Sequence, residues 1–196
     1  MIKRFSDILF SFLGLLVLFP FFLLISLCII CIDGFPVFYN QKRVGRKGRD
    51  FFVMKFRTMK KDAEKKGALT ISSKDPRITR TGSFLRKYKI DELPQLFNVL
   101  FGDMSLVGPR PEVRKYVNLY NRDQLKVLEV KPGITDPASI EFANENELLG
   151  RSKDPEKTYI NEIMPAKLKL NLEYIRKQNF FSDLGVIFRT IFRVLG

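Results

Sequence analysis

The sequence predicts an α+β protein in which an N-terminal membrane helix precedes a small mixed helical domain with a β-hairpin and amphipathic helices. Three observations predict this class. An uncharged run from Ile8 to Ile32 is long enough, as a helix, to cross a hydrocarbon core of about 30 Å. Two strand-like segments follow it, and an amphipathic stretch ends the sequence. We therefore divide the chain into a membrane-embedded helix, residues 1–34, and one further domain, residues 35–196.

Pro20 lies near the middle of the apolar run, where a proline removes one backbone hydrogen bond and bends a helix. Both ends of the run are flanked by basic residues, which favour the cytoplasmic side of a membrane. A helix that bends at Pro20 and returns to the same face satisfies both flanks, so we favour a re-entrant helix over a single-pass anchor. The run has no small-residue cleavage site, so we do not expect a removable signal peptide. The flanking basic residues are Lys3, Arg4, Lys42, Arg43, Arg46, Lys47 and Arg49.

Two strands are predicted at residues 36–41 and 51–59, joined by a turn at residues 45–50 that contains two glycines. In the second strand Lys55 and Arg57 share one face because side chains alternate along a strand. Two adjacent cations suit a diphosphate, and they suit a solvated strand face equally well. The polar side chains that we assign to this hairpin are Gln41, Arg43, Lys55 and Arg57.

The segment from Lys89 to Pro111 contains two adjacent carboxylates and an arginine between two prolines. Asp91 is expected to cap a helix that continues to Leu100, and near a helix start the carboxylates of Asp91 and Glu92 should keep a low pKa. Ionised carboxylates bind Mg²⁺ or attack an electrophile. Arg110, held in a stiff extended segment, suits a phosphate. The plain alternative is that Asp91 is only a helix cap.

The remaining segments are predicted from periodicity and turn residues. Lys60 to Arg80 is polar and is predicted to be a mobile loop. Glu112 to Val130 is predicted to be a helix, whereas Ile134 to Asn146 has no clear period. Phe180 to Leu195 repeats apolar residues at helical spacing, with arginines among them. Such a helix packs against a core or lies in the bilayer interface, and the pattern suits both.

Composition limits the chemistry of the chain. Its formal net charge of +13 comes from 34 Lys and Arg against 21 Asp and Glu, which favours nucleotides, nucleic acid or lipid headgroups as partners. The sequence has no histidine, which excludes a His general base, a Ser-His-Asp triad and a His-ligated zinc site. Cys28 and Cys31 lie inside the apolar run, where they are better explained as small apolar residues than as a redox or metal pair.

Several motifs, in one order along nearly the whole chain, give it a family resemblance. The motifs are Lys3-Arg4-Phe5-Ser6-Asp7, Gln41 to Gly45, Lys55 to Met59, Asp75-Pro76-Arg77, Leu85-Arg86, Asp91 to Leu96, Gly102 to Pro111, Lys131 to Thr135 and Asp183-Leu184. With these motifs the chain resembles the small monotopic phosphoglycosyl transferases, the bacterial sugar transferases that begin O-antigen, capsule, exopolysaccharide or glycoprotein glycan assembly.

The resemblance implies transfer of a sugar 1-phosphate from a UDP-sugar to polyprenyl (undecaprenyl) phosphate, with release of UMP. It places the reaction at the cytoplasmic face of the bacterial inner membrane and makes residues 35–196 a catalytic domain with a C-terminal interfacial helix. Asp91 becomes the nucleophile of a covalent aspartyl phosphosugar, Glu92 assists the metal or the lipid, and both are expected to bind Mg²⁺. The residues expected to bind the substrates are Lys55, Arg57, Arg86, Arg110, Gln41 and Arg43.

Two departures from the family pattern bear on these expectations. Phe19 replaces the serine that close relatives place before the membrane proline, so a hydroxyl that could satisfy the broken backbone is missing. Asn171 stands where some relatives carry an aspartate.

Two alternative functions remain open. One is a membrane-tethered module that binds nucleic acid or anionic lipid by charge, and the other is a scaffold that has lost activity. The resemblance favours membrane lipids over nucleic acid as partners, and it leaves the sugar, the pathway and any homo-oligomer open.

Overall fold

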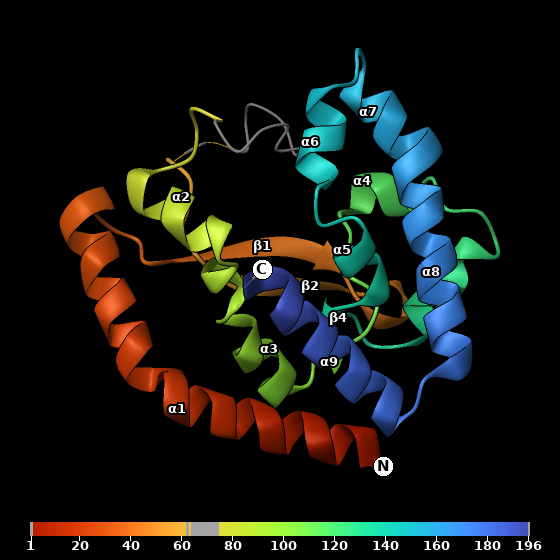
Figure 1. Cartoon of the computed structure of the whole chain (residues 1–196), viewed down its shortest axis with the longest axis horizontal. Helices are drawn as coiled ribbons and strands as arrows, with labels where there is room; N and C mark the ends of the chain where they lie inside the picture. The colour runs from red at the N-terminus through yellow and green to blue at the C-terminus, as the bar shows by residue number, and fades with distance from the viewer. Residues whose placement is uncertain (1, 62, 64–74, 196) are drawn as a thin grey trace.

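The computed structural model describes residues 2–61, 63 and 75–195, and its first element is the helix α1, Ile2–Asp33, with Pro20 inside it. In Figure 1 α1 runs along the lower edge of the molecule and then turns up its left side. Its most apolar 18-residue window has a mean hydropathy of 3.1, and only 11% of that window is buried. By length and composition α1 is the one helix in the described ranges that is apolar enough to cross a membrane, which is consistent with a membrane-anchoring helix. The re-entrant path stays a prediction.

The predicted hairpin is confirmed. Strands β1, Phe38–Val44, and β2, Asp50–Phe56, pair antiparallel, with Phe38 opposite Phe56 and Val44 opposite Asp50. The short 3-10 helix η1, Arg46–Gly48, makes the turn. The second strand ends at Phe56, so Lys55 belongs to it whereas Arg57 lies beyond it.

Three short elements connect the hairpin to α1. Helix α2, Arg80–Lys87, is followed by the 3-10 turn η3, Ile90–Glu92, and by helix α3, Gln95–Phe101. The side chain of Asn98 in α3 bonds the edge of β2, accepting from Met54 N at 2.9 Å and donating to Phe52 O at 2.7 Å. Most of the predicted mobile loop from Lys60 to Arg80 lies outside the described residues. The core between α1, β2 and α2 contains Phe22, Ile29, Phe56 and Leu85.

A second, parallel pair of strands crosses the centre of the domain. Strands β3, Ser105–Val107, and β4, Gly133–Thr135, pair in parallel. Immediately after β3 the backbone passes so close to β4 that a Cβ on Gly133 would lie 2.1 Å from Gly108 N. Only glycine fits such an approach. The close crossing fixes the point at which the chain leaves β3 toward Arg110.

The predicted helix from Glu112 to Val130 is wrong as a single element. Only α4, Arg114–Val117, and the 3-10 helix η4, Gln124–Glu129, form there. The side chain of Asn121 accepts hydrogen bonds from Asp123 N and Gln124 N, which favours a turn over continued helix.

Residues after β4 are mostly helical, and Asp136 explains the first of these helices by accepting from Ser139 N at 2.9 Å as an N-cap. Helix α8 is the longest of the group, and Tyr116, Leu149, Ile163 and Leu168 are part of the core beneath it. The elements are α5, Pro137–Glu141, α6, Glu145–Gly150, α7, Pro155–Thr158, the π-helix η5, Tyr159–Ile163, and α8, Met164–Lys177.

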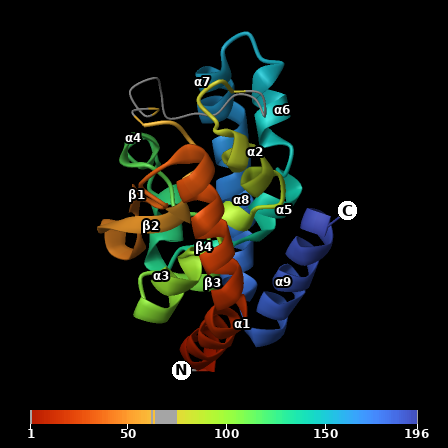
Figure 2. The same ribbon diagram turned by 90° about the vertical axis from the view of Figure 1, so that its left-hand side faces the viewer.

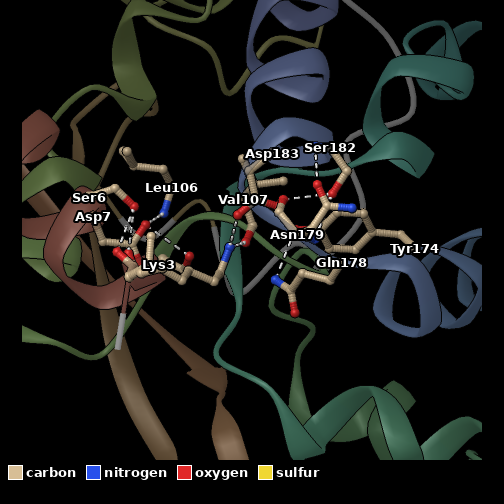
Figure 3. A network of polar contacts seen from close by, with 12 residues as sticks. Lys3, Ser6, Asp7, Leu106, Val107, Tyr174, Gln178, Asn179, Ser182 and Asp183 are labelled. Carbon is tan, nitrogen blue, oxygen red and sulfur yellow. Dashed lines mark hydrogen bonds and ion pairs between the residues drawn. The ribbon is translucent and has the colours of Figure 1, made fainter.

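The predicted C-terminal helix is confirmed as α9, Phe180–Leu195. Figures 1 and 2 place its beginning beside the beginning of α1. Figure 3 shows Lys3 of α1 reaching between Val107 and Asp183; its amine donates to Val107 O at 2.9 Å and pairs with the Asp183 carboxylate. Tyr174 of α8 donates to the same carboxylate. One buried carboxylate thus joins α1, α8 and α9.

The two expectations for α9 apply to its two faces. Val186 is buried against Val107 and Tyr174 in the core, as a packed helix requires. Another face leaves large apolar side chains in contact with solvent, as an interfacial helix requires, and Phe192 is 74% exposed. The exposed apolar residues of α9 are Phe180, Phe181, Phe188, Ile191 and Phe192.

Candidate active site

Asp91 and Glu92 lie in the 3-10 turn η3, and not at the cap of a long helix. Pro94 occupies the N-cap position of α3, and no side chain caps that helix, so the predicted capping role of Asp91 is wrong. The cause is Lys89, whose left-handed backbone (φ 56°, ψ 19°) ends the α2 segment and turns the chain before Asp91. This turn places the carboxylate among basic side chains from other elements.

The Glu92 carboxylate is held by two cations. Lys55 Nζ of β2 lies 3.0 Å from Glu92 Oε1, and Arg110 pairs with the carboxylate through two nitrogens, one of them 2.9 Å from Oε2. Burial alone would raise the pKa of Glu92, but Arg110 and Lys55 hold that pKa well below its usual value. Glu92 therefore stays ionised and fixes both cations in place.

Asp91 differs from Glu92 in its contacts and in its pKa. Asp91 is 6% exposed, and the cations Lys55 and Arg110 form their salt bridges with Glu92 and not with Asp91. Burial, and then the negative charge of Glu92, raise the pKa of Asp91 to about 6, although Lys55 and Arg86 oppose the shift. The expectation of a low pKa for Asp91 is thus wrong in direction, whereas it holds for Glu92.

Arg110 reaches this cluster from the loop that follows β3. Gly108 N donates to Thr135 O at 3.0 Å, so the loop starts from a fixed point, and Pro109 and Pro111 restrict its backbone. Glu92 raises the pKa of Arg110, while burial lowers the pKa of Lys55 and Glu92 opposes that decrease. The predicted phosphate-binding arginine therefore lies beside Asp91 and Glu92, with Glu92 as its present partner.

Arg43 and Gln41 form a neighbouring network. Arg43 donates to Gln41 Oε1 at 2.8 Å and to Glu112 Oε1 at 3.1 Å, and Tyr159 donates to the same Glu112 carboxylate. Burial lowers the pKa of Arg43, partly offset by Glu112. Sequence reasoning missed Glu112 and Tyr159. Glu112 directly follows Pro109-Arg110-Pro111, and this position could have marked it as a site residue. Nothing in the sequence distinguishes Tyr159 from the other tyrosines.

The other two predicted cations have structural partners. Arg57 is 6% exposed and donates to backbone carbonyls at the end of α1, to Asp33 O at 2.8 Å and Phe35 O at 3.0 Å. Arg86 donates from Nε to Thr58 Oγ1 at 2.8 Å. Lys55 and Arg57 thus contact different parts of the molecule, and in this arrangement they do not form one diphosphate grip.

Carboxylate oxygens available to a metal are few. Among the described residues there is no group of three or more His, Cys, Asp or Glu side chains arranged for a metal ion. Mg²⁺ needs fewer protein ligands than that, since it keeps waters and binds substrate phosphates. Glu92 already pairs with two cations, so Asp91 is the carboxylate of the predicted pair that Lys55 and Arg110 leave free of a salt bridge.

Comparison with known proteins gives this arrangement a context. A family model described as bacterial sugar transferase matches residues 1–196. A Bacillus subtilis (strain 168) protein, provisionally named an undecaprenyl-phosphate N-acetylgalactosaminyl 1-phosphate transferase, is 51% identical over 57% of this chain. The UDP-N-acetylgalactosamine-undecaprenyl-phosphate N-acetylgalactosaminephosphotransferase of Aeromonas hydrophila is 36% identical over 99% of it. The UDP-glucose:undecaprenyl-phosphate glucose-1-phosphate transferase of Xanthomonas campestris pv. campestris is also 36% identical over 99%.

The matched parts of these relatives differ in extent. The chain spans 62% of the Bacillus protein, 44% of the Aeromonas protein and 39% of the Xanthomonas protein. Their names also specify different sugars, N-acetylgalactosamine in two and glucose in the third. These relatives therefore share a kind of reaction in their names, but not one sugar donor.

Proposed function

Because the chain belongs to the bacterial sugar transferase family, we propose that it transfers a sugar 1-phosphate from a UDP-sugar to polyprenyl phosphate, such as undecaprenyl phosphate, and releases UMP. This extends to the chain what is said in the names of two relatives that match 99% of its length. One observation carries the proposal: Glu92 holds Lys55 and Arg110 in place beside the buried Asp91, and neither cation forms its salt bridge with Asp91.

Asp91 is the proposed nucleophile. One of its oxygens attacks the sugar-side phosphorus, the bond from that phosphorus to the bridging oxygen breaks, and UMP leaves with the electron pair. An oxygen of the lipid phosphate then attacks the same phosphorus, and the bond to Asp91 breaks, which restores the carboxylate. A pKa of about 6 leaves most Asp91 ionised at neutral pH without a separate base, which supports this role in a chain without histidine.

Lys55 and Arg110 are the proposed partners of the diphosphate. Phosphoryl transfer depends mainly on alignment and on neutralising the oxygens that do not move, which fixed cations supply. Glu92 positions these two cations before the donor arrives, and Arg86, whose pKa is lowered by burial and raised by Asp91, adds positive charge beside the nucleophile. Arg43 contributes through its network with Glu112.

Mg²⁺ fits this site in part, and we propose it as the cofactor. Asp91 and the donor diphosphate would hold it, with Glu92 engaged by Lys55 and Arg110 in the present arrangement. Bound there, the ion would offset diphosphate charge.

The membrane arrangement is also a proposal. We place α1 in the cytoplasmic membrane as a re-entrant helix, the domain on the cytoplasmic face, and the exposed apolar face of α9 at the bilayer interface. Support comes from the mean hydropathy of α1, from the basic residues on both of its flanks, and from the exposed side chains of Phe188 and Phe192. The lipid acceptor and the soluble donor would then meet at one site, in the first membrane step of glycoconjugate assembly.

The test uses the full chain in lipid nanodiscs with Mg²⁺, polyprenyl phosphate and a panel of UDP-N-acetylgalactosamine, UDP-galactose and UDP-glucose, with UMP as the readout. We expect UMP from at least one donor, and kcat/KM that falls about tenfold per pH unit below about pH 6 as Asp91 becomes protonated. With donor alone, intact mass should show one sugar phosphate bound to Asp91.

Asp91→Asn should abolish UMP release, and Asp103→Asn, a matched change at an exposed carboxylate, should not. An active Asp91→Asn variant, or an adduct on another side chain, contradicts the mechanism. No UMP from any donor, with membrane binding intact, favours the scaffold.

A further inference from the structure

A second group of cations surrounds a cavity that none of the proposed catalytic steps uses. The cavity has a volume of about 480 Å³ and lies where α1 ends and α2 begins, two elements that Figure 1 shows side by side. Asp91, Glu92, Lys55 and Arg110 do not line it. The described residues that line it are Ile32, Asp33, Arg57, Lys60, Lys61, Ile78, Thr79 and Arg80.

The walls of this cavity are held by backbone hydrogen bonds. Lys60 N donates to Arg77 O at 2.8 Å and Thr79 N donates to Thr58 O at 3.0 Å, so the two segments that flank the cavity run together. Arg57 attaches them to α1 through its bonds to the carbonyls that end that helix. The cavity is therefore built by three connected elements and is not a gap between loose side chains.

The charge around the cavity is unbalanced. Among the described residues, four cations line it, Arg57, Lys60, Lys61 and Arg80, against one carboxylate, Asp33. The structure gives Lys60, Lys61 and Arg80 no side-chain partner in the described residues, and Arg80 lies in the first turn of α2, where a positive charge is unfavourable. Such a cluster of positive charges attracts anions.

Two buried polar atoms beside the cavity also lack partners. Arg57 is 6% exposed, and its Nε–H donates no hydrogen bond to the described residues. This is unusual, because most buried donors have a hydrogen-bond partner. Asp33 Oδ2 likewise accepts no hydrogen bond. Both residues line the cavity, so a ligand that combines an anionic oxygen with a hydroxyl donor would suit the two side chains together.

The position of the cavity points to the source of that ligand. Ile32 is 60% exposed and Phe35 is 66% exposed, so apolar surface adjoins the cations at the end of α1. If α1 lies in the bilayer, this end reaches the depth of the lipid headgroups. We propose that the cavity binds the phosphodiester headgroup of an anionic phospholipid of the phosphatidylglycerol type, with a glycerol hydroxyl facing Asp33.

This assignment distinguishes bulk phospholipid from the acceptor. A polyprenyl phosphate carries a phosphate monoester without a headgroup hydroxyl, so it leaves Asp33 Oδ2 unpaired. Phosphatidylcholine lacks both net negative charge and a hydroxyl donor. The proposal goes beyond the proposed catalysis and does not depend on Asp91.

The experiment is native mass spectrometry of the full chain released from detergent micelles that contain equal amounts of phosphatidylglycerol and phosphatidylcholine. We expect wild-type protein to retain phosphatidylglycerol preferentially. The variant Lys60→Gln/Lys61→Gln/Arg80→Gln should lose that preference at least about tenfold, because each interfacial cation contributes about fivefold in affinity for an anionic headgroup. These side chains are exposed, so a wild-type elution volume and melting temperature are expected for the variant.

The matched control is Arg122→Gln/Arg151→Gln/Lys153→Gln, which removes three exposed positive charges elsewhere and should keep the wild-type preference. Equal preference in the two triple variants would overturn the proposal. Displacement of the lipid by millimolar inorganic phosphate would assign the cavity to a soluble anion and overturn the lipid assignment. Displacement by equimolar polyprenyl phosphate would overturn it in favour of the acceptor.

Discussion

Replacing Asp91 with asparagine should stabilise the protein while removing its proposed nucleophile. The residue is buried at 6% exposure, and burial together with Glu92 raises its pKa from 3.8 to about 6. At about 1.4 kcal/mol per pKa unit, that difference costs the folded state about 3 kcal/mol when Asp91 is ionised. Asparagine keeps nearly the same shape without the charge, so the free energy of unfolding should increase by about that amount at neutral pH.

The sign of the pH dependence follows from the direction of the shift. Between pH 3.8 and about pH 6 the folded state binds more protons than the unfolded state, so the Asp91 contribution falls as the pH rises. The advantage of asparagine is therefore fully present above about pH 6 and disappears below about pH 4. Thermal unfolding in detergent should show a melting temperature about 6–12 °C above wild type at pH 7.5.

The control for this prediction is Asp103→Asn, which changes an exposed carboxylate and should leave the melting temperature unchanged. The reasoning is refuted if Asp91→Asn melts at or below the wild-type temperature at pH 7.5. It is also refuted if the difference between the two proteins stays constant from pH 5 to pH 8.

Three further substitutions test the backbone and the contacts between elements. Lys89→Gly should raise the melting temperature by about 2–4 °C, since glycine removes the roughly 1 kcal/mol cost of a left-handed backbone; a decrease would show that the lost charge matters more. Gly133→Ala places a methyl group 2.1 Å from Gly108 N and should prevent recovery of folded protein, whereas Gly185→Ala, with open space around its Cβ, should be tolerated. Asp183→Asn weakens the contacts to α1 and α8 and should lower the free energy of unfolding by about 1–3 kcal/mol; an unchanged melting temperature would contradict the role assigned to this carboxylate.

The parts of the fold that follow from local pattern were predictable. Residues 8–32 carry no charge, and the described helix α1 includes all of them. The turn with Gly45 and Gly48 lies between two runs of strand-forming residues, and β1 and β2 pair across it. In both cases one short-range rule, hydrophobic length or turn chemistry, decides the structure.

The error at Asp91 shows why a site is harder to predict than an element. An aspartate before an apolar helix is the usual sign of a cap, but the left-handed Lys89 moves the turn and makes Asp91 a buried residue. Its pKa is then set by Glu92, Lys55 and Arg86, which come from different elements. No local rule contains that information.

Cations were predicted more easily than their partners. Arg110 was identified from two neighbouring prolines, and it lies beside the paired carboxylates. Arg57 was assigned with Lys55 from strand alternation, but β2 ends at Phe56 and Arg57 donates to the carbonyls of α1 instead. Where β2 ends, and that the end of α1 lies beside it, both depend on tertiary structure and could not be predicted from local sequence.

The contact between Lys3 and Asp183 also limits how early the protein can finish folding during its synthesis. The two residues are 180 positions apart in the chain. A ribosome adds about 5–20 residues per second, so roughly 10–40 s separate the appearance of one partner from that of the other. Throughout that interval Lys3 cannot form its salt bridge with Asp183, which has not yet been synthesised. The hydrophobic helix α1 must therefore be kept soluble, or be inserted into the membrane, without this contact to α9.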